Sequence, residues 1–103
     1  MKVILDEMLP AAVAGLLPDH DVSTVKAAGY TGYTGLSNGE LIRRAAGDGY
    51  EVLLTADRNL PASGIALILV RGSRMADIEP QAARIRAAVA GARPGTVTRV
   101  ERG

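Results

Sequence analysis

The feature that most constrains the fold is the run at residues 65–70, where six apolar residues follow one another without a polar side chain. A strand of this kind does not alternate between polar and apolar positions, so it has to be covered on both faces. Shorter strand-like runs occur at residues 3–5 and 52–56, and stretches with helical periodicity separate them. This alternation predicts an α/β fold, with a mainly parallel sheet of about five strands and helices on both faces.

The same pattern predicts where the individual elements lie. Strands are expected at residues 2–5, 21–25, 51–56, 65–70 and 96–100, with the last strand at an edge of the sheet. Helices are expected around residues 9–17, 37–47 and 77–92. Residues 18–20 form a turn in this interpretation, and residues 26–36 form a loop in which Gly-Tyr-Thr occurs twice.

Length and composition limit the class of protein. A chain of 103 residues is near the commonest domain size, so residues 1–103 are expected to form one domain. The absence of cysteine excludes disulfides, thiolate catalysis and cysteine-based zinc sites, and His20 is the only histidine. No apolar run approaches the length of a membrane span, and only three apolar residues separate Lys2 from Asp6. We therefore expect a cytoplasmic protein without a membrane partner.

Three acidic residues stand at positions where a parallel sheet brings side chains together. Asp6 and Asp57 each follow a predicted strand directly, and Glu40 lies at the start of the helix between them. The carboxyl ends of parallel strands share one edge, where ligands of open α/β sheets bind. Converging carboxylates repel one another unless a cation neutralises them, and hard oxygen ligands suit Mg²⁺ or Mn²⁺. The arrangement predicts a metal site.

Each acid also has a purely structural interpretation. Ser37 and Glu40 have the spacing of a capping box, with Leu36 and Leu41 at the spacing of a hydrophobic staple. Asp6 could cap the first helix, and Asp57 could cap the turn that follows it. Only their shared place at one edge of the sheet favours a functional site over three separate caps.

The charged and aromatic residues near this edge allow a phosphate-bearing substrate. The net charge is only +1, but several arginines are expected close to the acids: Arg43, Arg44, Arg58, Arg71 and Arg74. Tyr30 and Tyr33 could stack on bases of a single-stranded nucleic acid. The alternatives are an ordinary solvated arginine surface and tyrosines that pack on the domain itself.

Three segments together resemble a known family. Residues 4–10 (ILDEMLP), 36–41 (LSNGEL) and 53–61 (LLTADRNLP) look like the motifs of DUF5615-type PIN-like proteins, which are similar to PIN-domain ribonucleases and to the toxins of bacterial toxin–antitoxin pairs. Two departures stand out. Met8 occupies a place where such proteins often have Asn, and residues 62–64 are short where relatives have a longer polar stretch.

The resemblance implies a function and a set of site residues. It implies a ribonuclease dependent on Mg²⁺ or Mn²⁺, in which Asp6, Glu40 and Asp57 hold the metal and act in catalysis. Asn59 stands where the family can have a further acid, and it is expected to contact the RNA substrate together with Arg58, Arg43 and Tyr33. An antitoxin protein is the implied partner, and a homodimer is compatible with the resemblance.

Two other functions remain open from the residues alone. The chain could be a PIN-like module that binds RNA or a protein partner without cleavage. It could also be a receiver-type domain that is phosphorylated on Asp57, since Asp6 and Glu7 are adjacent acids after the first strand. A receiver should have a lysine at the end of its last strand, but residues 96–100 contain none, and Glu40 would have no role in it.

Overall fold

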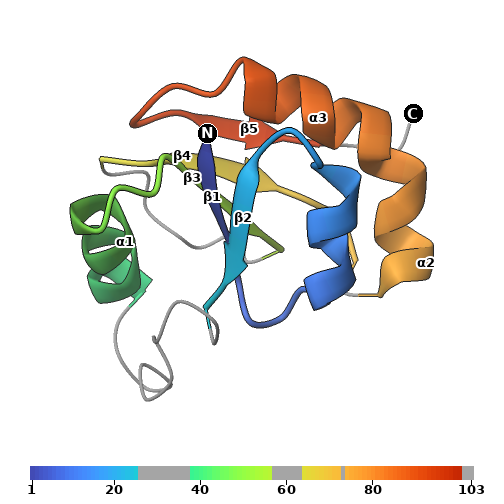
Figure 1. Cartoon of the computed structure of the whole chain (residues 1–103), viewed down its shortest axis with the longest axis horizontal. Coiled ribbons are helices and arrows are strands. Elements are labelled where there is room, and N and C mark those ends of the chain that lie inside the picture. Colours follow the sequence, from blue (N-terminus) through green and yellow to red (C-terminus); the bar gives the residue numbers. More distant parts are fainter. Residues whose placement is uncertain (26–37, 57–63, 73, 101–103) are drawn as a thin grey trace.

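The chain forms an α/β fold built on a five-stranded parallel sheet (Figure 1). The computed structural model describes residues 1–25, 38–56, 64–72 and 74–100. In chain order the elements are β1 (Lys2–Leu5), η1 (Ala11–Leu16), β2 (Asp21–Thr24), α1 (Asn38–Gly47), β3 (Val52–Thr55), β4 (Ala66–Leu69), α2 (Met75–Ile78), η2 (Glu79–Gln81), α3 (Ala82–Ala90) and β5 (Val97–Arg99). The strand order is β2-β1-β3-β4-β5. The predicted fold class is confirmed, with β5 at an edge as expected.

The sheet is buried on both faces, and its central strands β3 and β4 are apolar except for Thr55. All residues of β3 and β4 are buried, and the side chains of residues 52–54 and 66–68 alternate between two core clusters. Leu54 and Ile68 belong to the cluster beneath η1, α2 and α3, whereas Leu53 and Leu67 belong to the cluster beneath α1. Figure 1 shows α1 on one side of the sheet and the other helices on the opposite side. The unbroken apolar run at residues 65–70 is thus explained.

Two of the predicted helices differ in type from a regular α-helix. The segment after β1 is a 3-10 helix, η1, whose N-cap is Pro10. The expected helix at residues 77–92 begins earlier, at Met75, and contains the 3-10 segment η2 between α2 and α3. Pro80 lies in η2 and has no N–H to donate, which accounts for the interruption. The predicted apolar face persists, since Ile78, Ile85 and Val89 are all buried. No helix within the described ranges is both long and apolar enough to cross a bilayer.

The turn from β4 into α2 is held by one buried polar side chain. Gln81 is 1% exposed, its Nε2 donates to the carbonyls of Arg71 and Asp77 at 2.8 Å each, and its Oε1 accepts from the N–H of Arg71 at 3.2 Å. Gly72 lies in this turn at φ +87°, where an added Cβ would come within 2.4 Å of the Cβ of Asp77. The amide of Gln81 therefore fixes the chain where it leaves the carboxyl end of β4.

This arrangement predicts a strong effect of Gln81→Leu on stability. Leucine has similar volume but leaves the backbone groups of Arg71 and Asp77 without their partner, which should lower the free energy of unfolding by about 1–3 kcal/mol. Urea unfolding followed by circular dichroism measures the change. Glu79→Gln, an exposed substitution in the same 3-10 segment, should stay within about 0.5 kcal/mol of the parent. Equal unfolding midpoints for parent and Gln81→Leu would show that the turn is held by other contacts.

Candidate site at the carboxyl edge of the sheet

The strand order reverses between β1 and β3, the position at which open α/β sheets have their ligand crevice. This position at the carboxyl ends of β1 and β3 is called the crevice below. The chain passes from β1 to β2, which lies next to β1 on the side away from β3. From β3 it passes to β4, which lies next to β3 on the side away from β1. In open α/β sheets, ligands bind outside the carboxyl ends of the strands at this point of reversal. Leu5 and Leu54 are paired near the carboxyl ends of the two strands, so Asp6 stands directly at the crevice. The predicted position of Asp6 at the carboxyl edge is borne out by this pairing.

Two hydrogen bonds fix Asp6 against β3. Its backbone N–H donates to the carbonyl of Leu54 at 2.9 Å, which extends the ladder between the strands by one residue. Its carboxylate Oδ2 accepts from the hydroxyl of Thr55 at 2.6 Å. Thr55 is fully buried, whereas Asp6 is half-buried. A hydrogen bond to a charged acceptor is among the stronger kinds, so Thr55 orients the carboxylate at the crevice.

Thr55 was not predicted as a site residue, although the sequence carried a signal for it. It is the only polar side chain in the strand-like run at residues 52–56. A hydroxyl in a buried strand requires a hydrogen-bond partner, and the partner here is a predicted site acid. The interpretation of Asp6 as the cap of the first helix is wrong, because η1 starts from Pro10 and has no side-chain cap bond.

Helix α1 brings Glu40 to the same side of the sheet as Asp6. Thr55 shares its face of β3 with Leu53, which packs in the core cluster beneath α1. The C-terminal end of α1 lies at the opposite, amino edge, where the Nζ of Lys2 donates to the carbonyl of Asp48 at 2.9 Å. The helix therefore runs from the carboxyl edge back to the amino edge (Figure 1). Glu40 is half-buried in its first turn, where the helix dipole also favours an acid.

Several predicted site residues lie outside the described residues. These are Asp57, Arg58, Asn59 and Tyr33, together with Ser37 of the expected capping box. Within the described ranges, no group of three or more acidic or histidine side chains is placed to hold a metal ion. Because Asp57 lies outside the described residues, the convergence of Asp6, Glu40 and Asp57 stays a prediction.

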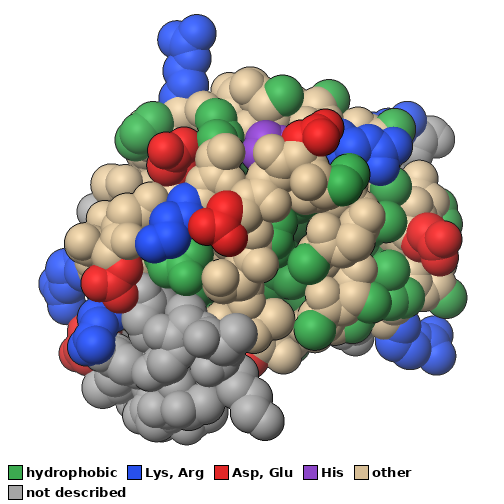
Figure 2. Space-filling view, viewed as in Figure 1, with side chains coloured by type: hydrophobic (Ala, Val, Ile, Leu, Met, Phe, Trp, Pro, Cys, Tyr) green, Lys and Arg blue, Asp and Glu red, His purple; other side chains and the backbone are tan. Residues whose placement is uncertain are grey.

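The arginines expected near the acids are distributed over both edges. Arg43 is exposed on α1, three residues after Glu40, and Arg71 is exposed just beyond β4 at the carboxyl edge. The Nε of Arg44 lies 3.8 Å from the Oδ2 of Asp48, so this side chain forms an ion pair directed along α1 toward the amino edge. Figure 2 shows positive and negative side chains interspersed over the face it presents. Arg43 and Arg71 are thus the described arginines best placed for a substrate at the crevice.

Comparison with known proteins identifies no protein similar to this chain. No protein-family model, curated protein or solved structure matches the chain. The functional argument therefore rests on the residues and their placement.

A double-mutant cycle should measure the contact between Asp6 and Thr55. We expect Asp6→Ala and Thr55→Val to be coupled by about 1 kcal/mol in the free energy of unfolding, because each removes the same charge-assisted hydrogen bond. Thr55→Ser keeps the hydroxyl and serves as the control, with a smaller loss than Thr55→Val. Urea unfolding of the two single variants and the double variant gives the coupling. Additive effects within about 0.3 kcal/mol would mean that Thr55 does not orient the carboxylate.

Proposed function

We propose that the protein is a ribonuclease dependent on Mg²⁺ or Mn²⁺, with its active site at the carboxyl edge between β1 and β3. The observation that carries the proposal is the Asp6 carboxylate, oriented by the buried Thr55 hydroxyl at the crevice of the sheet. Glu40 in the first turn of α1 supplies a second acid on the same side. The resemblance of three segments to PIN-like proteins supports the choice of RNA and extends the proposal to a cytoplasmic toxin with an antitoxin partner.

The donor chemistry at this edge fits a hard divalent cation. Asp6 and Glu40 offer carboxylate oxygens, the ligands that Mg²⁺ and Mn²⁺ prefer, and Asp57 follows β3 in the sequence by two residues. A bound cation would activate water and neutralise charge on the phosphate oxygens. In this proposal Thr55 holds Asp6 in place, and the guanidinium groups of Arg43 and Arg71 attract the phosphate backbone.

Cation binding should appear first as a gain in stability. A ligand that binds only the native state at about 100 times its Kd stabilises it by about 2.7 kcal/mol. We expect Mn²⁺ to raise the free energy of unfolding of the parent protein by this amount and to support cleavage of single-stranded RNA. Asp6→Asn and Asp57→Asn should each lose most of both effects, since each removes one negative charge from the site.

Asp21→Asn is the matched control for these variants. It removes the same charge, but Asp21 is exposed at the start of β2. There it lies opposite Lys2 in the strand register, at the amino edge of the sheet. It should keep the Mn²⁺ effect on stability and the cleavage of RNA. Stabilisation by Mn²⁺ without cleavage by the parent would favour a binding module that does not cut RNA. If a millimolar titration of Mn²⁺ changes neither stability nor RNA, the proposal is wrong.

A receiver-type phosphoacceptor domain is the second candidate, and the strand order favours it. The order β2-β1-β3-β4-β5 is that of flavodoxin-like domains, which include bacterial receivers. In this alternative Asp6 and Glu7 bind the cation, and Asp57 accepts the phosphoryl group. The lack of a lysine at the end of β5 weighs against it, because the strand ends at Arg99 and continues with Val100.

Acetyl phosphate distinguishes the two candidates. The ribonuclease proposal predicts no covalent labelling of the protein when it is incubated with acetyl phosphate and Mg²⁺, and intact mass spectrometry measures this directly. A gain of one phosphoryl group that disappears in Asp57→Asn but persists in Asp21→Asn would establish the receiver function. Cleavage of RNA without labelling would exclude it.

A further inference from the structure

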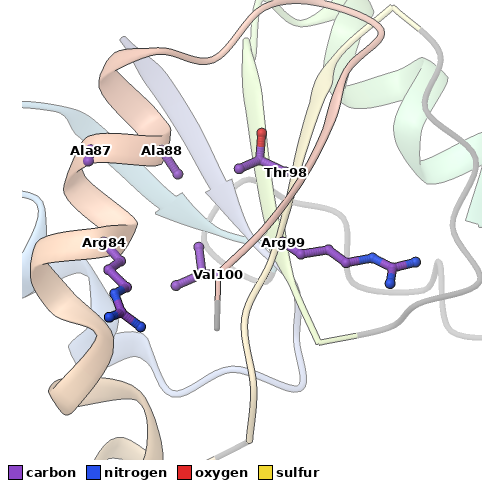
Figure 3. Close-up of a pocket in the computed structure, with 6 residues that line it drawn as sticks. All are labelled: Arg84, Ala87, Ala88, Thr98, Arg99 and Val100. Atoms are coloured by element: carbon purple, nitrogen blue, oxygen red, sulfur yellow. The ribbon is translucent and has the colours of Figure 1, made fainter. Parts of the chain in front are cut away.

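Within the part of the chain that the structure describes, β5 pairs only with β4, and its outer edge lies beside a groove. A groove of about 640 Å³ runs along it between β5 and α3, lined by Arg84, Ala87, Ala88, Thr98, Arg99 and Val100 (Figure 3). The small side chains of Ala87 and Ala88 leave this space between helix and strand. If a sixth strand paired with β5, its side chains on the face toward α3 would fill this groove.

The hydrogen-bond pattern shows which backbone groups of β5 are directed outward. The carbonyl of Thr96 accepts from Leu67, and the N–H of Val100 donates to Leu69, so the groups of the even-numbered residues are directed toward β4. In a parallel ladder the intervening residues direct their N–H and C=O groups to the other side. Val97 and Arg99 therefore present an edge without a strand partner among the described residues, and the side chain of Val97 is 48% exposed. Such an edge is a template for an added strand.

The charge along this edge selects the kind of strand that can bind. Residues 80–100 contain four arginines and no acidic residue, and the nearest acids in the chain, Glu79 and Glu101, lie just outside this range. All four are exposed: Arg84, Arg86, Arg93 and Arg99. Figure 3 shows Arg84 on the α3 side of the groove and Arg99 extending from β5 in the direction away from α3. An added strand would thus meet a positive charge on each of its faces.

We propose that the edge of β5 binds an acidic, extended peptide segment of another protein as a sixth strand. Backbone hydrogen bonds to Val97 and Arg99 supply affinity, and acidic side chains near Arg84 and Arg99 supply selectivity. A second copy of this chain is disfavoured, because pairing of two β5 edges about a twofold axis brings two sets of arginines together. The inference does not depend on the proposed nuclease activity.

The test uses a labelled peptide with alternating glutamate and valine, acetyl-EVEVEVE-amide carrying a fluorescent group. Fluorescence anisotropy should show saturable binding to the full chain that weakens as NaCl rises, because the pairing is partly electrostatic. The matched peptide with lysine in place of glutamate should not bind. Equal binding of both peptides, or of neither, would overturn the proposal.

Two variants separate the backbone edge from the charge. Val97→Pro removes only an outward N–H, and proline is tolerated on edge strands, so it should weaken peptide binding about tenfold with the fold retained. Val97→Thr keeps the N–H and should bind like the parent. Arg99→Glu reverses a charge at the edge and should weaken binding by at least about tenfold, whereas Arg44→Glu on α1 makes the same charge change outside the groove.

Other occupants of the edge give different results in the same experiments. Sedimentation velocity that shows a dimer lost in Val97→Pro would assign the edge to a second copy. A labelled hexauridylate that binds in competition with the peptide, and that Arg99→Glu weakens while Val97→Pro does not, would assign the arginines to RNA. Either result would refute the proposed peptide partner.

Discussion

The parallel pairing of β1 with β3 brings together Asp6, which follows β1, and Thr55 of β3, two candidate site residues 49 positions apart in the chain. Both strands are buried from either side, so their apolar side chains hold the two core clusters together. The reversal of strand order at this pair opens the crevice, and the register places Asp6 next to the end of β3. The core and the candidate site therefore depend on the same contact.

The fold was predictable from the sequence where apolar patterns were long and unambiguous. Residues 65–70 had to form a doubly covered strand, and the periodic positions Ile78, Ile85 and Val89 had to face the core. The strand order was not predictable, because every strand of a parallel sheet carries a similar apolar pattern. The 3-10 character of η1 was not predicted either, since it depends on the final hydrogen-bond geometry of the segment after Pro10.

The site was predictable only in part. The place of Asp6 follows from its position after a strand, whatever the strand order. Its partner Thr55 could not be assigned without knowing that β1 and β3 are neighbours. Glu40 illustrates a different problem, because the first turn of a helix favours an acid for electrostatic reasons whether or not that acid also binds a ligand. An acid in the first turn of a helix can be assigned to a binding site only when other ligand-binding side chains are shown to lie close to it.

The neighbours of β1 also have a consequence for the order of folding during synthesis. The ribosome makes β1 first, and it can pair with β2 once residues 21–24 have emerged, but its other edge stays open until β3 is complete. Non-local parallel pairing of this kind is slow, and an open apolar edge exposes the nascent chain to aggregation in the meantime. The contact between Asp6 and Thr55 consequently forms late, so a truncated or partly folded chain carries both residues without their hydrogen bond.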